Sequence, residues 1–279
     1  MGAKFPLKYV VLALCAILVQ VAAQIVAAGA GTLVLSICGI VEIGNVTAAV
    51  IYPLVTLAGL WALCRTMGGS MAEFRMPKPK LDGIWCAAAV LMPLIVCGIY
   101  VLLPGQFAAD PERMGTGLII SSTILYTGFA AGIAEEAVFR GVIMTAIENR
   151  WGRAAAVLVP SVLFGALHLM NGPMTLASKS LVIAAGTMVG ILFSLAAVVS
   201  GNVWNGALMH GVWNAVITGV LHIGPGTDPW ALFSYVPEST SIWLTGGDFG
   251  VEASIVSVGV YVLFIVLAVI ILRRKQQEI

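Results

Sequence analysis

Residues 84–103 read IWCAAAVLMPLIVCGIYVLL, a stretch without a single charged side chain. A helix of this length rises about 30 Å at 1.5 Å per residue, which matches the hydrocarbon thickness of a bilayer. Similar apolar runs recur along the chain, separated by charged residues or by glycine and proline. They predict about eight transmembrane helices, near residues 9–28, 44–64, 84–103, 116–147, 154–170, 180–200, 203–222 and 251–272.

The stretch 29–43 is apolar and contains glycine. It fits a loop, a short interfacial segment or an extension of a neighbouring span, and its sequence alone leaves these three alternatives open.

The composition of the whole chain supports a membrane protein. Of its 279 residues, 60% are hydrophobic and 10% are charged, and the mean hydropathy is +1.02. Soluble domains carry about 25% charged residues, so this chain has too few polar groups to cover a surface in water. We therefore predict an all-α polytopic protein with a single transmembrane domain over residues 1–279, integral to the plasma membrane. The net charge of +1 indicates no nucleic-acid partner.

Lysine and arginine residues predict the orientation of this protein in the membrane. Eleven of the 14 fall into four groups near the ends of spans: Lys4 and Lys8; Arg65, Arg75, Lys78 and Lys80; Arg150 and Arg153; and Arg273, Arg274 and Lys275. The alternate loops are mainly acidic, with Arg113 and Lys179 as their basic exceptions. Because basic loops stay in the cytoplasm, we predict that both termini are cytoplasmic.

Ionisable residues inside an apolar span indicate function, because each costs about 2.5–3.5 kcal/mol at a helix centre. The fourth predicted span contains Glu135, Glu136 and Arg140. Arg140 lies four residues after Glu136, so the two share a helical face and can form a structural ion pair. Glu135 lies about 100° around the helix from Glu136. Glu135 is therefore the carboxylate that this pairing leaves free to react.

The chain has three histidines, His168, His210 and His222. Glu136 lies sixteen residues before Gly152, and His168 lies sixteen residues after it. In an antiparallel helical hairpin that turns at Gly152, the two residues reach the same depth. His222 lies at the outer end of its span, and we interpret it as an interfacial bystander.

His210 and Asn214 lie one turn apart in the seventh predicted span, so both can donate hydrogen bonds towards one point. A single intramembrane histidine or asparagine more often holds helices together. Two carboxylates, an arginine, two histidines and an asparagine on three apolar helices are harder to explain in that way. The sequence therefore predicts a polar site on the helices of residues 116–222.

These residues resemble a known family signature. Glu135-Glu136-x-x-x-Arg140, Phe164-x-x-x-His168 and His210-x-x-x-Asn214 match in order and spacing the three motifs of the CPBP family. That family comprises CAAX proteases and bacteriocin-processing enzymes, and it is also called the Abi or Rce1-like type II CAAX prenyl endopeptidase family.

The resemblance implies an eight-helix intramembrane protease with a polar cavity that opens towards the cytoplasm. It further implies that Glu135 and His168 activate water, that His210 and Asn214 form an oxyanion hole, and that Glu136 and Arg140 are structural. The expected partners are a membrane-associated protein or peptide substrate and the lipid bilayer. The sequence does not identify the substrate or tell whether it is prenylated.

Several alternatives stay open at this stage. No cofactor is expected, but Glu135, His168 and His210 with a water would make a plausible catalytic zinc set. A transporter that uses buried charges as an ion relay is disfavoured, because the chain has few buried acids and no inverted repeat. A non-proteolytic bacteriocin-immunity or scaffold protein on the same fold is the remaining alternative.

Overall fold

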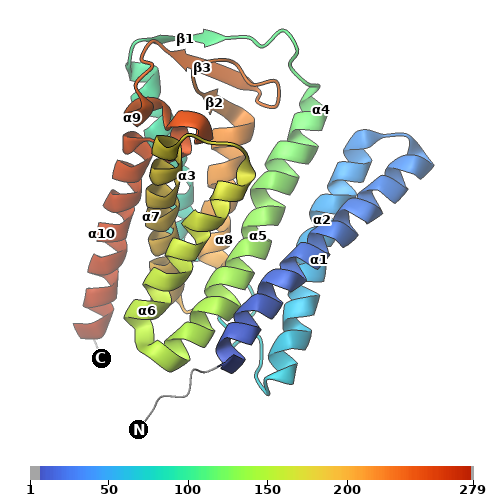
Figure 1. Ribbon diagram of the computed structural model, residues 1–279, viewed down its shortest axis with the longest axis vertical. Coiled ribbons are helices and arrows are strands. Elements are labelled where there is room, and N and C mark those ends of the chain that lie inside the picture. The colour runs from blue at the N-terminus through green and yellow to red at the C-terminus, as the bar shows by residue number, and fades with distance from the viewer. Residues whose placement is uncertain (1–6, 278–279) are drawn as a thin grey trace.

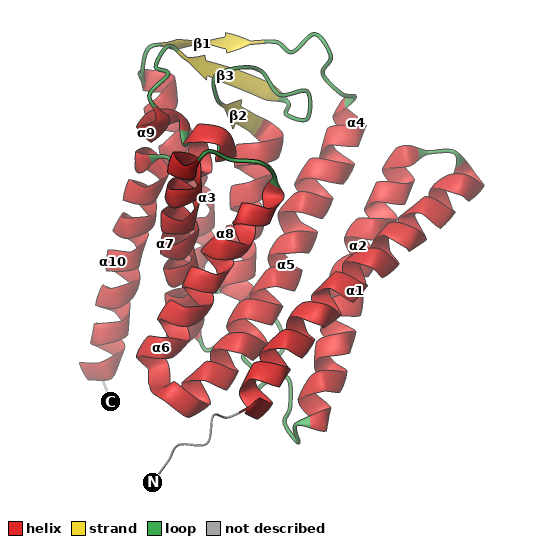
Figure 2. Cartoon of the chain, viewed as in Figure 1, coloured by secondary structure: helices red, strands yellow, loops and turns green. Residues whose placement is uncertain are grey.

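The computed structural model describes residues 7–277, which fold into a bundle of long helices with a small sheet at one end (Figures 1 and 2). Helices α1 (Leu7–Cys38) and α2 (Val41–Thr66) pair as a long hairpin that leans away from the other helices towards its turn (Figure 1). Gly39 makes this turn with a φ of +70°, a value that glycine adopts without strain. The stretch 29–43 is therefore an extension of both neighbouring helices.

One continuous helical segment carries the first motif. It comprises α4 (Thr116–Ile119), η1 (Ile120–Ala130), α5 (Ala131–Glu136) and η2 (Ala137–Ile143), and it runs on into α6 (Met144–Leu167). Segments η1 and η2 are π-helical, and such wide turns are frequent at functional sites. Gly152 breaks the helix with φ 81° and ψ 176°, so α6 turns back along the segment that precedes it, as the sequence predicts.

Helices α3 (Gly83–Leu102), α7 (Leu176–Ser200), α8 (Trp204–Asn214) and α10 (Ile255–Gln277) enclose the largest apolar core. Helix α8 continues into the π-helical η4 (Ala215–Val220). Close packing of α6 on α7 depends on small residues. A Cβ atom on Gly186 would lie 2.6 Å from the Cα atom of Gly165, and one on Gly190 would lie 2.9 Å from the Cα atom of Ser161. Small residues on α7 thus permit close packing of the two helices.

Six helices of the described chain are long and apolar enough to cross a membrane: Leu7–Cys38, Val41–Thr66, Gly83–Leu102, Thr116–Asn171, Leu176–Ser200 and Ile255–Gln277. The fourth is 56 residues long and contains both predicted spans that flank Gly152. The predicted span 203–222 corresponds to α8 and η4, which are 11 and 6 residues long and together shorter than a full span. The prediction of an all-α, multi-pass membrane protein is confirmed.

The sequence did not predict the three-stranded sheet formed by β1 (Gly105–Ala108), β2 (Leu221–Ile223) and β3 (Phe233–Pro237). The strand order is β1-β3-β2, with β1 antiparallel and β2 parallel to β3. The sheet covers the end of the bundle that lies opposite the ends of the described chain (Figure 2). His222 lies in β2, where its Nδ1 is 3.7 Å from a carboxylate oxygen of Asp228.

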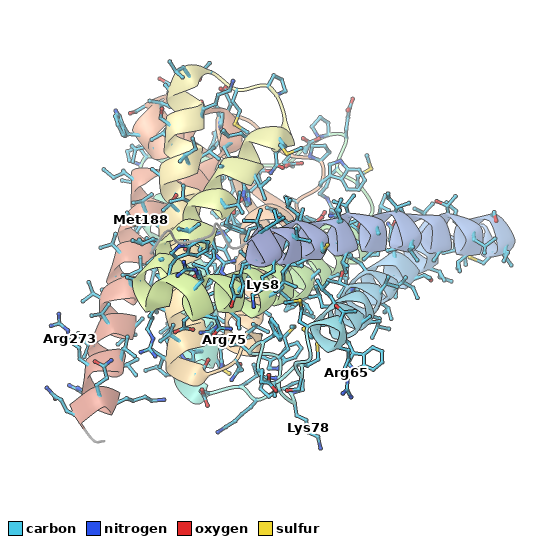
Figure 3. All side chains as sticks on the ribbon, turned by 60° about the horizontal axis from the view of Figure 1, so that its bottom comes forward. Lys8, Arg65, Arg75, Lys78, Met188 and Arg273 are labelled. Carbon is cyan, nitrogen blue, oxygen red and sulfur yellow. The ribbon has the colours of Figure 1, made fainter. Side chains whose placement is uncertain are left out.

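The predicted basic groups gather at the other end of the bundle. Figure 3 shows this end with five of their members: Lys8, Arg65, Arg75, Lys78 and Arg273. Lys4 lies outside the described residues. The loop between α2 and α3 is fixed to this end, since the Arg75 guanidinium pairs with the Glu148 carboxylate and donates to the Thr145 hydroxyl at 2.7 Å.

Candidate active site

The two adjacent glutamates of α5 lie in different environments. The Glu136 side chain is fully buried, whereas the Glu135 side chain keeps 23% of its surface exposed. This difference follows from helical geometry, because neighbouring residues point about 100° apart. Glu135 points into a groove, and Glu136 points into the protein interior.

Arg140 holds Glu136 in that interior position. One guanidinium nitrogen of Arg140 donates to Oε1 of Glu136 at 2.7 Å, and another donates to the Gly190 carbonyl on α7 at 3.2 Å. Both members of this predicted ion pair are fully buried. Within the described residues, Oε2 of Glu136 and Nε of Arg140 have no hydrogen-bond partner. A buried pair that loses either member leaves an uncompensated charge, so the two residues depend on each other.

His210 connects the buried pair with the reactive carboxylate. Its Nδ1 lies 3.2 Å from Oε1 of Glu136, and its Nε2 lies 3.9 Å from Oε2 of Glu135. Because an ionised carboxylate only accepts hydrogen bonds, the Nδ1 atom of His210 carries a hydrogen and donates a hydrogen bond to Glu136. The ring also stacks on Phe193, with ring centroids 5.3 Å apart. Glu136 therefore orients His210 as well as pairing with Arg140, and the sequence reasoning missed this contact.

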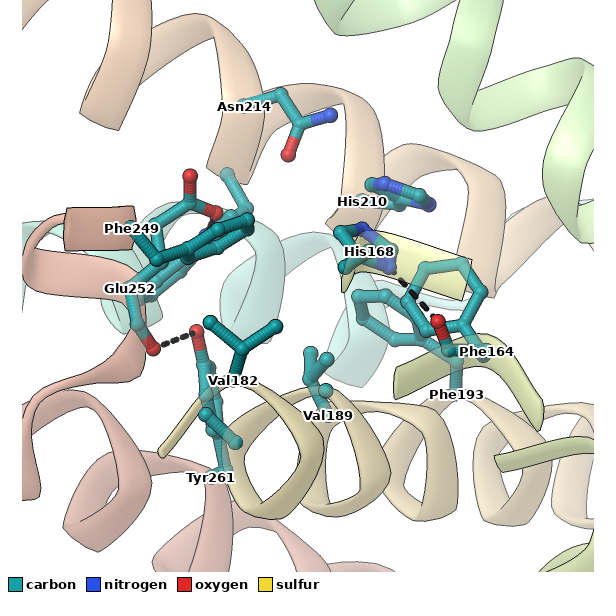
Figure 4. Close-up of a pocket in the computed structure, with 13 residues that line it drawn as sticks. Phe164, His168, Val182, Val189, Phe193, His210, Asn214, Phe249, Glu252 and Tyr261 are labelled. Atoms are coloured by element: carbon teal, nitrogen blue, oxygen red, sulfur yellow. Dashed lines mark hydrogen bonds between the residues drawn. The ribbon is translucent and has the colours of Figure 1, made fainter. Parts of the chain in front are cut away.

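His168 ends α6 and begins the short 3-10 helix η3 (His168–Asn171). Its Nδ1 lies 2.7 Å from the Phe164 carbonyl oxygen (Figure 4). A carbonyl can only accept, so Nδ1 of His168 carries a hydrogen, and in the neutral ring Nε2 is the atom with a free lone pair. The Phe164 ring lies beside His168 and also contacts His210, with centroids 4.6 and 5.7 Å away. The second-motif phenylalanine thus packs between the two histidines.

Asn214 lies one turn beyond His210 on α8. Its side-chain nitrogen donates to the Thr127 carbonyl on η1 at 3.2 Å. An asparagine amide has two N–H donors, so one remains for a ligand in the groove. The Thr127 contact fixes the amide relative to the helix that carries Glu135.

The four predicted catalytic residues line one groove. Its wall includes Glu135, His168, His210 and Asn214, and it continues with Thr127, Ala131, Asn171, Met174, Thr218, Asp248, Phe249 and Glu252. An adjoining apolar chamber lies behind the histidines, between α7, α8 and α10 (Figure 4). The polar groups of the groove therefore lie beside a small chamber with a partly apolar lining.

Residues outside the three motifs complete the site. Glu252 lies in η6 (Val251–Ala253), and its carboxylate accepts from the Trp213 indole at 2.8 Å. Tyr261 donates to the Glu252 carbonyl at 3.3 Å. The sequence reasoning missed this group, although a glutamate at the start of the last apolar run was a usable signal.

Asp248 holds the groove-side loops together. It lies in η5 (Gly247–Phe249), after the short helix α9 (Ile242–Thr245). Its carboxylate accepts from the backbone N–H of Thr175 at 2.8 Å, ahead of α7. The Thr175 backbone and the Ser178 and Thr175 side chains lower the pKa of Asp248. Asp248 therefore stays ionised at neutral pH and ties the loop before α10 to the start of α7.

The residues of the alternative zinc set, Glu135, His168 and His210, do not form a metal-binding cluster in the described structure. In the part of the chain that the structure describes, no group of three histidine, cysteine, aspartate or glutamate residues lies close enough to hold a metal ion. Metal independence nevertheless stays a prediction.

Fold and site together define a multi-pass membrane protein with a carboxylate–histidine centre on the faces of apolar helices. The family model of Rce1-like type II CAAX prenyl endopeptidases matches residues 117–216, a segment that contains all three motifs. This match confirms the resemblance over residues 117–216, and it supports a CAAX-type intramembrane endopeptidase in general terms. No curated protein matches the chain. No solved structure matches it either.

Proposed function

We propose that the protein hydrolyses a peptide bond of a membrane-associated protein or peptide, with Glu135 as the general base and no metal. The observation that carries this proposal is the asymmetry of the glutamate pair. Glu136 is fully buried and paired, whereas Glu135 faces the groove beside His210. A carboxylate that is accessible from the groove and is not held in an ion pair with arginine can accept a proton from water.

In the first step, Glu135 removes a proton from a water molecule, whose oxygen attacks the carbonyl carbon of the substrate. His168 presents the free lone pair of its Nε2 to the same groove and shares the water proton. The carbonyl becomes a tetrahedral oxyanion. When the C–N bond breaks, the proton held by Glu135 or His168 passes to the leaving amine.

The oxyanion would be stabilised by His210 and Asn214. Because Nδ1 of His210 donates to Glu136, a donor at Nε2 requires the imidazolium form. The Glu136 carboxylate accepts a hydrogen bond from Nδ1 and orients the ring, in the way that a buried aspartate orients the histidine of a serine protease.

The experiment compares cells that carry the wild-type chain with cells that carry Glu135→Gln. New peptide ends in membrane and culture fractions are mapped by terminal proteomics. An endopeptidase should generate ends that disappear in Glu135→Gln cells at equal protein abundance. A bacteriocin-immunity or scaffold protein would leave the same ends in both, and that result would overturn the proposed function.

A further inference from the structure

The catalytic groove reaches only one end of the bundle. From Glu135 and His210 in the helices, its wall continues to Asn171, Met174 and Asp248. These three belong to the loops between α6 and α7 and ahead of α10. Those loops lie opposite the ends of the described chain, on the side of the sheet (Figure 1). A substrate segment thus approaches from that side.

The groove is closed towards the other end. Every residue from 136 to 147 is buried. The loop between α2 and α3 seals this region, since the Phe74 carbonyl and the Met76 side chain would each lie 3.1 Å from a Cβ atom on Gly141. The same loop is fixed to α8, because the Trp204 indole donates to the Pro77 carbonyl at 2.8 Å. Glu135 is therefore inaccessible from that end.

The closed end is also the basic end. It carries the groups that include Lys8, Arg65, Arg75, Lys78 and Arg273 (Figure 3). The segments at the open end carry mainly acidic residues, namely Asp110, Glu112, Asp228, Glu238, Asp248 and Glu252, with Arg113 and Lys179 as the basic exceptions. The positive-inside rule places the basic end in the cytoplasm. The orientation of the protein and the position of the open end of the groove together determine from which side of the membrane a substrate enters.

We propose that the catalytic groove opens on the extracytoplasmic side of the membrane, and that its substrates are membrane-associated peptide segments exposed on that side. This inference rests on the proposed function for its chemistry and deepens it by naming the substrate class. The two sequence predictions of cytoplasmic termini and a cytoplasmic cavity cannot both hold if the termini lie on the same side as the ends of the described chain, because the groove opens at the opposite end of the bundle. A peptide anchored at the cytoplasmic leaflet would meet the sealed loop.

The lining of the groove agrees with an internal segment of an exported peptide. Its described lining residues include the carboxylates Asp248 and Glu252 but neither lysine nor arginine. A peptide whose free C-terminal carboxylate lies beside the reacting bond would find no lysine or arginine to pair with in this lining. An internal segment that continues through the groove has no terminal carboxylate and needs no such partner.

Labelling of single cysteines tests the orientation directly. In a chain whose five cysteines are changed to alanine, Met170→Cys places a thiol at the open end, where Met170 is 81% exposed. Lys78→Cys is the matched control in the loop at the basic end. A membrane-impermeant maleimide should label Met170→Cys in intact cells, and Lys78→Cys only after permeabilisation. The reverse pattern, or equal labelling of both in intact cells, would overturn the proposal.

A second measurement covers the case in which the cysteine-free chain does not fold. Green fluorescent protein fused after residue 279 of the native chain should fluoresce, and alkaline phosphatase at the same point should be inactive. The opposite result would place the C-terminus outside and refute the inference.

The positions of the Glu135-dependent peptide ends separate this inference from the proposed function. They should fall in extracytoplasmic segments of membrane proteins or in released peptides. Glu135-dependent ends in cytoplasmic segments would refute the inference while supporting the peptidase. If no Glu135-dependent peptide ends are found, the proposed peptidase function is refuted. The two orientation assays would still show on which side of the membrane the groove opens.

Discussion

The two faces of helix α5 carry the same functional group in opposite settings. On one face, Glu136 is fully buried and is held by Arg140 at 2.7 Å and by His210 at 3.2 Å. On the other face, Glu135 is 23% exposed and lies 3.9 Å from His210. Fixed charges position a site, whereas a group that reacts needs solvent access and a free lone pair. Burial and pairing therefore assign one glutamate to structure and the other to chemistry.

The largest expected effect on stability belongs to the buried face. Arg140→Ala leaves the Glu136 carboxylate unpaired in the interior, which should cost about 3–5 kcal/mol of unfolding free energy. The measurement is the expression level of the variant and its thermal midpoint in detergent. Both should be lower than in wild type, whatever the variant's cleavage rate.

Arg153→Ala is the matched control. Arg153 also pairs with a glutamate, Glu148 at 3.2 Å, but its side chain is 55% exposed. Exposed pairs contribute about 0–1 kcal/mol, so this variant should keep a nearly normal midpoint. Equal losses in Arg140→Ala and Arg153→Ala would break the distinction between the buried and open settings.

A smaller effect, on rate alone, is expected at the oxyanion site. Asn214→Ala should lower kcat about 10²–10³-fold, the usual cost of one lost oxyanion donor, with little change in KM. Thr218→Val is its control, because Thr218 lines the same groove but its hydroxyl donates to the Asn214 carbonyl of its own helix. A rate loss of similar size in both variants would mean that Asn214 acts through local packing.

The smallest expected effect is that of removing metal. Because the groove residues do not form a three-ligand cluster, chelation should leave the rate of the purified protein unchanged. His168→Ala should also lower the cleavage rate more than His210→Ala, because His168 shares in water activation whereas His210 is one of two oxyanion donors. A zinc site would need both histidines equally. Stoichiometric zinc, with activity lost on chelation and restored by zinc alone, would move Glu135, His168 and His210 into the role of metal ligands.

The helices and motifs could be read from the sequence because both depend on local spacing. Apolar runs about 20 residues long have few alternatives in a bilayer. The Glu136–Arg140 pair follows from a separation of four residues, and the turn at Gly152 from a break between two runs. These features need no knowledge of which helices are neighbours.

Features that depend on distant contacts were not predictable. The sheet joins β1, which follows α3, to β3, which lies more than 120 residues later along the chain. The contact between Glu136 and His210 links residues 74 positions apart. The side on which the groove opens depends on the loop that packs against Gly141. Each of these contacts is set by tertiary packing and leaves no periodic trace in the sequence.

The most direct test of the glutamate assignment is the cleavage rate of purified Glu135→Gln relative to wild type, on a peptide that wild type is shown to cleave. We expect that cleavage is abolished while the thermal midpoint and membrane insertion stay those of wild type, because glutamine keeps the shape of glutamate and lacks its basicity. Substantial turnover by folded Glu135→Gln protein would contradict the account.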